Sequence, residues 1–190
     1  MSPPAFATIG HSNRPLDEVE AMLATAGVGL VVDVRAFPRS RRNPAFNIDT
    51  LPERLKARGV DYVHLAALGG RRPRQPDVPV QVNALWRIEA FHNYADYALG
   101  QAYAGAFAEL VTLGAGRRAV LMCAEAMWWR CHRRIIADYL VLNGHRVDHL
   151  MTPGRTTVAT PTPGSVLRDD GKVVYPEAAD DAVFSLADRS

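Results

Sequence analysis

The chain contains little cysteine: two residues in a length of 190. Two cysteines in a domain of this size do not form a disulfide framework, so we expect a protein of the reducing cytoplasm. No apolar run approaches the ~18 residues that a membrane helix requires, so we expect no membrane span. The first residues lack the basic flank and long apolar stretch of a secretory signal, and export is not expected.

Lysine is as rare as cysteine, because 20 of the 22 basic residues are arginine. The net charge of +2 conceals an uneven distribution, with ten basic and three acidic residues between Arg35 and Arg74, a local excess of about +7. Arg41-Arg42 and Arg71-Arg72 stand beside proline and glycine, which indicates loops. Such loops can bind phosphate or carboxylate through bidentate guanidinium contacts; the alternative is a solvated surface.

Short apolar runs alternate with segments of helical periodicity through the first 151 residues. The predicted strands are 6–10, 30–34, 60–65, 118–122 and 145–151. The predicted helices are about 16–26, 50–58, 83–99, 101–113 and 128–142. Alternation of this kind implies right-handed crossovers, so we predict a single three-layer α/β domain with a mainly parallel sheet of about five strands.

The composition changes after Met151. Residues 152–190 are rich in proline and threonine, which is typical of an irregular extension. A small hairpin is predicted around Asp170-Gly171, because this pair favours a tight turn between two short apolar runs. We therefore divide the chain into an α/β domain over 1–151 and a C-terminal extension over 152–190.

Polar residues gather where the predicted strands end. The carboxyl ends of parallel strands meet at one rim of a sheet, and this rim is where open α/β sheets bind ligands. The residues concerned are His11 and Ser12 after the first strand, Asp33, Arg35 and Ser40 after the second, Gly69 and Gly70 after the third, and Cys123 and Glu125 after the fourth.

Several of these residues also have a purely structural explanation. Asp33 can pair with Arg35, since a buried charge needs a partner. His11 can simply bond the turn that follows it. The Gly69-Gly70 pair can form a plain turn or allow backbone N–H groups to approach an anion. Tyr94 lies at helical spacing among aromatic residues, so it either packs or reaches the rim.

The segment from Cys123 to Arg133 collects two thiols, a carboxylate, an imidazole and a guanidinium between a strand and a helix. A helix N-terminus and nearby cations lower the pKa of a thiol, so Cys123 is the predicted nucleophile or redox centre. Thiol phosphatases place five residues between cysteine and arginine. Here six separate Cys123 from Arg130, which argues against that chemistry.

Three alternatives for the cysteine segment remain open. Cys123, Cys131 and His132, with His11 as a further donor, offer zinc ligands, although adjacent Cys131 and His132 should diverge on the predicted helix. A redox pair of Cys123 and Cys131 requires the intervening loop to fold back. Otherwise, Cys131 is a core residue and Cys123 a small residue at a crowded strand end.

Together these motifs resemble the DUF488 family, a domain of unknown function found in bacteria and archaea. The resemblance is carried by 8–13 (TIGHSN), 33–35 (DVR) with Pro38 and Ser40, 68–70 (LGG), Tyr94 and Tyr97, 123–125 (CAE), 131–133 (CHR), and His149. It extends over about residues 6–151 and implies a compact α/β domain with converging motifs. It implies no particular reaction.

The leading hypothesis is a cytoplasmic enzyme that acts on a small anionic substrate, such as a phosphorylated compound or a nucleotide, in a pocket at the strand ends. The expected catalytic residues are Cys123, Glu125, His11 and His132. The expected substrate-binding residues are Ser12, Asp33, Arg35, Ser40, Gly69, Gly70, Tyr94, Cys131 and Arg133. The alternatives are a non-catalytic module that binds nucleic acid or nucleotides through the arginine-rich loops, and a metal-binding protein. The sequence indicates neither a cofactor nor an oligomeric state.

Overall fold

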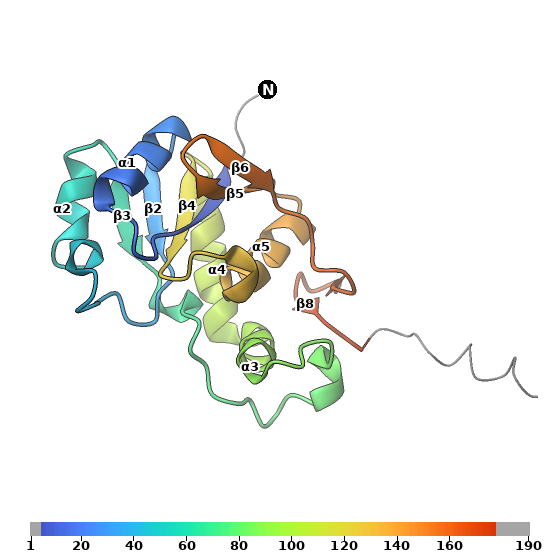
Figure 1. The fold of residues 1–190 in the computed structure, drawn as a ribbon. Helices are drawn as coiled ribbons and strands as arrows, with labels where there is room; N and C mark the ends of the chain where they lie inside the picture. Colours follow the sequence, from blue (N-terminus) through green and yellow to red (C-terminus); the bar gives the residue numbers. More distant parts are fainter. Residues whose placement is uncertain (1–4, 178–190) are drawn as a thin grey trace, which may run out of the picture.

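The computed structural model describes residues 5–177 and contains a six-stranded sheet in the order β3-β2-β4-β1-β5-β6 (Figure 1). The strands are β1 (Phe6–Gly10), β2 (Leu30–Asp33), β3 (Asp61–His64), β4 (Ala119–Cys123), β5 (Val147–Thr152) and β6 (Arg155–Val158). The first five are parallel and β6 is antiparallel to β5. The predicted α/β class and mainly parallel sheet are confirmed.

Helices cover both faces of the sheet (Figure 1). They are α1 (Leu16–Thr25), α2 (Leu51–Lys56), α3 (Glu89–Ala98), α4 (Gln101–Gly114) and α5 (Arg133–Leu142), with the 3-10 turns η1 (Pro44–Phe46), η2 (Ala66–Leu68), η3 (Val80–Asn83) and η4 (Trp128–Arg130). Side chains alternate along a strand, so Val31 packs under α1 and α2 while Val32 packs under α3 to α5. Within residues 5–177, no helix is long and apolar enough to cross a bilayer.

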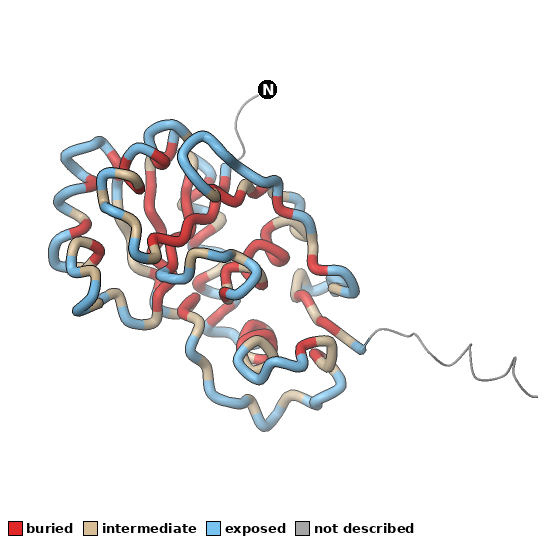
Figure 2. The backbone as a smooth tube through the Cα atoms, in the orientation of Figure 1, coloured by how far each residue is buried: buried red, intermediate tan, exposed pale blue. Residues whose placement is uncertain are grey.

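The most buried backbone runs through the centre of the sheet (Figure 2). All residues of β1, β2 and β4 are buried. Nearly continuous apolar runs are the expected pattern for parallel strands covered on both faces. Burial on both sides fixes the strands rigidly and so positions whatever follows their carboxyl ends.

The chain order places β4 between β1 and β2. The chain leaves β1, forms β2 and β3 to one side, and then returns to insert β4 beside β1, with Gly10 opposite Cys123. The ends of β1, β2 and β4 therefore meet at one rim. Loops that leave this rim in different directions leave a crevice between them.

The segment after Thr152 contributes to the main domain. Residues 155–158 form β6 on the edge of the sheet, and β7 (Val166–Leu167) pairs with β8 (Val173–Val174). The predicted hairpin is confirmed, with Gly171 at φ 78° in its turn. Beyond it, the hydroxyl of buried Tyr175 donates a hydrogen bond to Asp138 at 2.9 Å. The rest of the predicted extension, 178–190, lies outside the described residues.

The predicted helix over 128–142 is wrong in its first part. Residues 128–130 form η4, Cys131 is extended at φ −131° and ψ 149°, and α5 begins only at Arg133. Trp128 stacks on His149 with ring centroids 4.1 Å apart. Tertiary packing of this kind overrides local helix propensity, and it turns the chain back toward the end of β4.

Two glycines of α4 provide a matched test of this packing. A methyl group at Gly114 would overlap the ring of Phe6, whereas one at Gly105 would meet open space. We expect Gly114→Ala to lower the free energy of unfolding by about 1–3 kcal/mol through overpacking. Gly105→Ala should raise it by about 0.5–1 kcal/mol, because alanine is the better helix former. Urea unfolding followed by circular dichroism measures both, and equal effects would contradict the packing of α4 on β1.

Candidate functional site

A cavity of about 720 Å³ opens at the rim where β2 and β4 end. Its lining comes from the loops after β2, β3 and β4 and from the start of α3. The charged residues among this lining are Arg35, Arg39, Arg71, Arg130 and Glu125. Arg35 and Arg39 pair with Asp33 and Asp49. Arg71 and Arg130 have no carboxylate partner within residues 5–177, so against Glu125 the lining keeps a net positive charge, which attracts anions.

Both cysteines line this cavity. Cys123 is 8% exposed and Cys131 is 5% exposed, and neither is in a disulfide. The sulfurs of Cys123 and Cys131 and a ring nitrogen of His132 lie within 4.8 Å of one another. The loop between the cysteines therefore folds back and brings Cys131 close to Cys123. The sequence alone left this arrangement open.

Backbone contacts to the end of β1 hold the loop between the cysteines. The backbone N–H of Ser12 donates to the carbonyl of Ala124 at 2.9 Å. The carbonyl of Glu125 packs against Gly10, where any side chain would overlap it. Gly10 is thus required for close approach rather than for a turn.

His132 caps the start of α5 and faces Cys131. Its Nε2 lies 2.8 Å from the carbonyl of Val34, and its Nδ1 lies 3.5 Å from the sulfur of Cys131. A carbonyl only accepts, so Nε2 carries a proton and Nδ1 is left to exchange one with the thiol. Gly70 leaves room for the ring, and the Tyr94 ring packs against it with centroids 5.2 Å apart.

Arg133 is buried beneath the two cysteines and is 1% exposed. Its Nε–H points at the sulfur of Cys131 at 3.4 Å, and Nη2 donates to the backbone carbonyl of Glu125. Among residues 5–177, no carboxylate lies within ion-pair distance of Arg133. A buried guanidinium keeps its charge and needs an anion. A thiolate on Cys131 supplies one.

The two neighbouring thiols shift each other's pKa in opposite directions. The nearby Cys123 thiol lowers the pKa of Cys131 well below the usual cysteine value, and the charges of His132 and Arg133 lower it further. The nearby Cys131 sulfur, together with burial, raises the pKa of Cys123. The sequence prediction gave the reactive thiol to Cys123, whereas these contacts favour the thiolate on Cys131.

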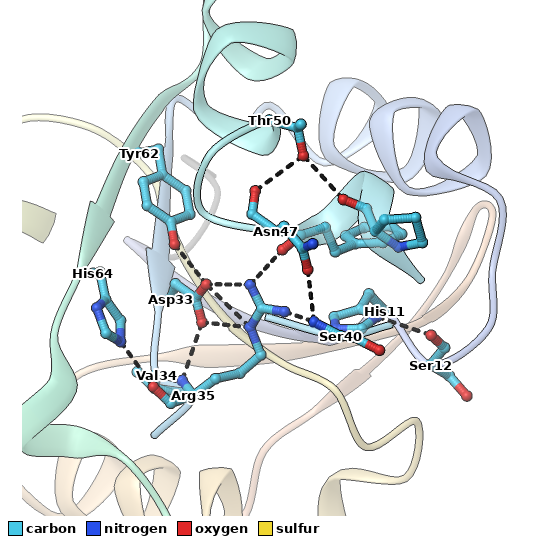
Figure 3. Close-up of polar contacts among 12 residues, drawn as sticks. His11, Ser12, Asp33, Val34, Arg35, Ser40, Asn47, Thr50, Tyr62 and His64 are labelled. Atoms are coloured by element: carbon cyan, nitrogen blue, oxygen red, sulfur yellow. Dashed lines mark hydrogen bonds and ion pairs between the residues drawn. The ribbon is translucent and has the colours of Figure 1, made fainter. Parts of the chain in front are cut away.

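Arg35 is held by the second charged cluster of the rim (Figure 3). Its guanidinium bonds both oxygens of Asp33, the shortest contact being 2.6 Å, and it donates to the carbonyl of Phe46 at 2.7 Å. Tyr62 donates to the same carboxylate at 2.6 Å. Here the buried charge is balanced within the cluster. The pairing of Asp33 with Arg35, considered as the structural alternative, is present.

His11 lies behind Arg35 rather than in the cavity. Its Nδ1 donates to the carbonyl of Ser12 at 2.8 Å, its Nε2 faces Nη1 of Arg35 at 3.3 Å, and its ring stacks on Phe46 (Figure 3). Burial lowers the pKa of His11 to about 4, with a further contribution from the charge of Arg35. A neutral imidazole here accepts from Arg35, so its role is to position that guanidinium.

The predicted site residues divide into two groups. Those that line the cavity are Arg35, Ser40, Gly70, Cys123, Glu125, Cys131 and His132. Those that lie behind its wall are His11, Ser12, Asp33, Gly69, Tyr94 and Arg133. Tyr94, for example, is fully buried and donates to the carbonyl of Leu68 at 2.7 Å. The second group holds the first in position.

Sequence reasoning did not single out Phe37, Arg39, Arg71 and Phe91 as lining residues. Phe37 is 68% exposed at the mouth, with the guanidinium of Arg71 over its ring at 5.8 Å. Arg72, the residue after Arg71, instead has its guanidinium over the ring of Tyr97, 4.0 Å from the ring centroid, and donates hydrogen bonds to backbone carbonyls. Only the three-dimensional placement of the loops distinguishes the two arginines, although proximity to glycine marked both as loop residues.

One comparison with known proteins gives a match. A family model described as "Domain of unknown function DUF488" matches residues 15–140. No curated protein and no solved structure matches the chain. The matched range contains Arg35, both cysteines, His132 and Arg133, while His11 and His149 lie outside it.

The buried histidines predict an acid-sensitive fold. Burial lowers the pKa of His11 and of His149 to about 4, against 6.5 for the unfolded chain. Between these values the unfolded state binds more protons, so the free energy of unfolding falls as the pH drops from 6.5 to 4, by up to about 3 kcal/mol per histidine. Urea unfolding across this range should show a shallower pH dependence in His11→Asn and in His149→Asn than in wild type. An unchanged slope would contradict neutral buried imidazoles.

Proposed function

The chain belongs to the DUF488 family, and we propose that it is a thiol-dependent enzyme that acts on a small anionic substrate, with Cys131 as the nucleophile. One observation carries this proposal. The sulfur of Cys131 borders an arginine-lined cavity and receives contacts from Cys123, His132 and Arg133. A thiolate is the reactive form of cysteine, and these are the surroundings that produce it.

His132 supplies the proton transfer that such a reaction needs. The thiol of Cys131 gives its proton to Nδ1 of His132, while the opposite nitrogen stays bonded to the carbonyl of Val34. The thiolate attacks the electrophilic atom of the substrate, and a bond from sulfur to that atom replaces the bond to the leaving group. The leaving group departs with the electron pair of its bond and takes the proton from His132.

The cavity favours a substrate that carries negative charge. Arg130 is exposed at the mouth, and Arg35 is fixed in the wall by Asp33. Guanidinium groups bind phosphate and carboxylate in planar, two-point contacts. A volume of about 720 Å³ lies in the range of small-molecule sites, which supports a phosphorylated compound or a nucleotide. Glu125, the only acidic residue of the lining, is the second candidate for proton transfer.

The basic loops give less support to nucleic-acid binding. Arg39 pairs with Asp49, and Arg54 and Arg58 both pair with Glu20. With Arg35, which pairs with Asp33, four of the ten basic residues between Arg35 and Arg74 are thus engaged in ion pairs. A nucleic-acid surface would need these charges free to face phosphates, so the contacts favour a small ligand in the cavity.

A metal site is the second candidate, because three donor atoms meet at the same point. The sequence argument that Cys131 and His132 diverge on a helix is wrong, since both precede α5. Two thiolates and one imidazole suit zinc, and the cavity leaves a fourth position open, as in catalytic zinc sites. The carbonyl of Val34 fixes the His132 ring with Nδ1 available, which is the usual support for a ligating histidine. A bound metal and a free nucleophile are alternatives for the same sulfurs.

The rate of alkylation by iodoacetamide across pH tests the nucleophile. Peptide mass spectrometry follows each cysteine separately. We expect Cys131 to react with a midpoint well below the ~8.5 of a free cysteine, and Cys123 only at higher pH. Cys123→Ala should raise the Cys131 midpoint, because it removes the neighbouring thiol that lowers the pKa of Cys131. Ordinary titration of both thiols in wild type would refute the assignment.

The same assay tests the anionic substrate. Inorganic phosphate or a nucleoside monophosphate in the cavity should slow alkylation of Cys131. Arg130→Gln should weaken this protection, since Arg130 lines the mouth. Arg146→Gln is the matched control, because exposed Arg146 directly precedes β5, at the amino end of that strand. Equal loss of protection in both variants would indicate general charge effects only.

Metal analysis separates the two candidates. If the site holds zinc, protein purified without a tag contains about one zinc ion per chain, and the Cys131→Ser variant loses most of this zinc. The thiolate proposal predicts less than a tenth of an equivalent and no effect of a chelator on the pH profile of alkylation. If wild type contains one metal ion per chain and substitution of either cysteine removes it, the proposal of a free nucleophile is rejected.

A further inference from the structure

The proposed nucleophile leaves the second cysteine without a chemical role. The chain has two cysteines, seven residues stand between them, and both line one cavity with their sulfurs within 4.8 Å of each other. Cys123 ends a central strand, whereas Cys131 follows a 3-10 turn.

We propose that Cys131 and Cys123 form a peroxide-reactive dithiol, in which Cys131 attacks the peroxide and Cys123 resolves the product as a disulfide. The inference rests on the proposed thiolate at Cys131 and goes further, because a simple nucleophile has no need of a second thiol.

The chemistry balances with a hydroperoxide as the oxidant. The thiolate of Cys131 attacks one peroxide oxygen, the O–O bond breaks, and the remaining oxygen leaves as an alcohol or water after it takes a proton. Cys131 is now a sulfenic acid. The sulfur of Cys123 attacks the sulfur of Cys131, an S–S bond forms, and the sulfenic oxygen leaves as water with the proton of the Cys123 thiol. An external dithiol returns the pair to the reduced form.

The contacts at the site favour the second step only after the first. The sulfurs of Cys123 and Cys131 lie within 4.8 Å of each other, so a negative charge on Cys131 disfavours a second one on Cys123. Oxidation of Cys131 to a neutral sulfenic acid removes that charge. No carboxylate among the described residues lies within ion-pair distance of buried Arg133, so its charge then favours loss of the proton from the Cys123 thiol. The same guanidinium thus activates the two sulfurs in turn.

The backbone around Cys131 allows the sulfurs to close to bonding distance. A disulfide needs about 2.05 Å between sulfurs, shorter than any hydrogen-bonded contact. Cys123 is fixed by the sheet, and its carbonyl accepts from His11 at 2.9 Å. Cys131 is extended and precedes the helix, and the loop before it is mostly exposed. Movement is therefore expected at Cys131 and in 124–130, while β4 stays in place.

Hydrogen peroxide in equimolar amount, added to reduced full-length protein, tests the proposal. Intact mass and free-thiol titration should show loss of two hydrogens and of both thiols, with the protein still a monomer on a non-reducing gel. Dithiothreitol should restore both thiols. Cys123→Ser should instead stop at a sulfenic acid on Cys131, which dimedone labels, and Cys131→Ser should react at least tenfold more slowly than wild type.

The outcomes distinguish this proposal from the proposed function. If Cys131 is alkylated at neutral pH but peroxide drives it to sulfinic acid equally fast in wild type and Cys123→Ser, the resolving role is overturned and the nucleophile stands. A disulfide between two chains also overturns it. If Cys131 reacts with neither iodoacetamide nor peroxide faster than Cys123 does, both proposals fail.

Discussion

The rim of the sheet is organised by buried positive charge. Arg35 and Arg133 are 5% and 1% exposed, and a guanidinium cannot lose its charge to escape the cost of burial. Arg35 is balanced by Asp33, a carboxylate two residues away in sequence. Within residues 5–177, the hydrogen-bond partners of the Arg133 side chain are two backbone carbonyls and the sulfur of Cys131. In the proposed function, this difference assigns the negative charge of the site to a thiol rather than to a carboxylate.

The sheet order makes this arrangement possible. Because β4 lies between β1 and β2, the chain after Cys123 leaves from the middle of the rim and can return between its neighbours. Gly10 admits the backbone of the returning loop, and Gly70 admits the ring of His132. Both glycines serve close packing at ordinary backbone angles. The proposed chemistry therefore depends on the space that these two glycines leave as much as on the reactive groups themselves.

Sequence patterns predicted the strands well, because parallel strands buried on both faces read as apolar runs such as 30–34. They also placed Arg35, Cys123 and Glu125 at one rim, since parallel strands share their carboxyl ends. They could not predict that Cys131 meets Cys123, because that contact depends on Trp128 stacking on His149, a residue on another strand. Burial of Arg133 was equally hidden, because an arginine at a helix start is more often solvated.

Two further features depended on contacts that the local sequence does not encode. The segment 155–158 reads as a threonine-rich linker, yet it pairs with the exposed edge of β5 and completes the sheet. Its β-branched residues were the available signal, but pairing needs a partner edge that only the fold supplies. Arg39, Arg71 and Arg130 come from three separate loops and meet only around the cavity.

The proposed chemistry requires that Cys131 carries a thiolate while Cys123 remains a thiol. Nuclear magnetic resonance of protein labelled with ¹³C at the cysteine β-carbon tests it most directly, because the chain gives two signals and Cys131→Ser removes one. We expect the Cys131 signal to have the thiolate shift at neutral pH and to change only in acid, while the Cys123 signal stays that of a thiol. Two signals that titrate together near ~8.5, or a thiolate on Cys123 at neutral pH, would contradict it.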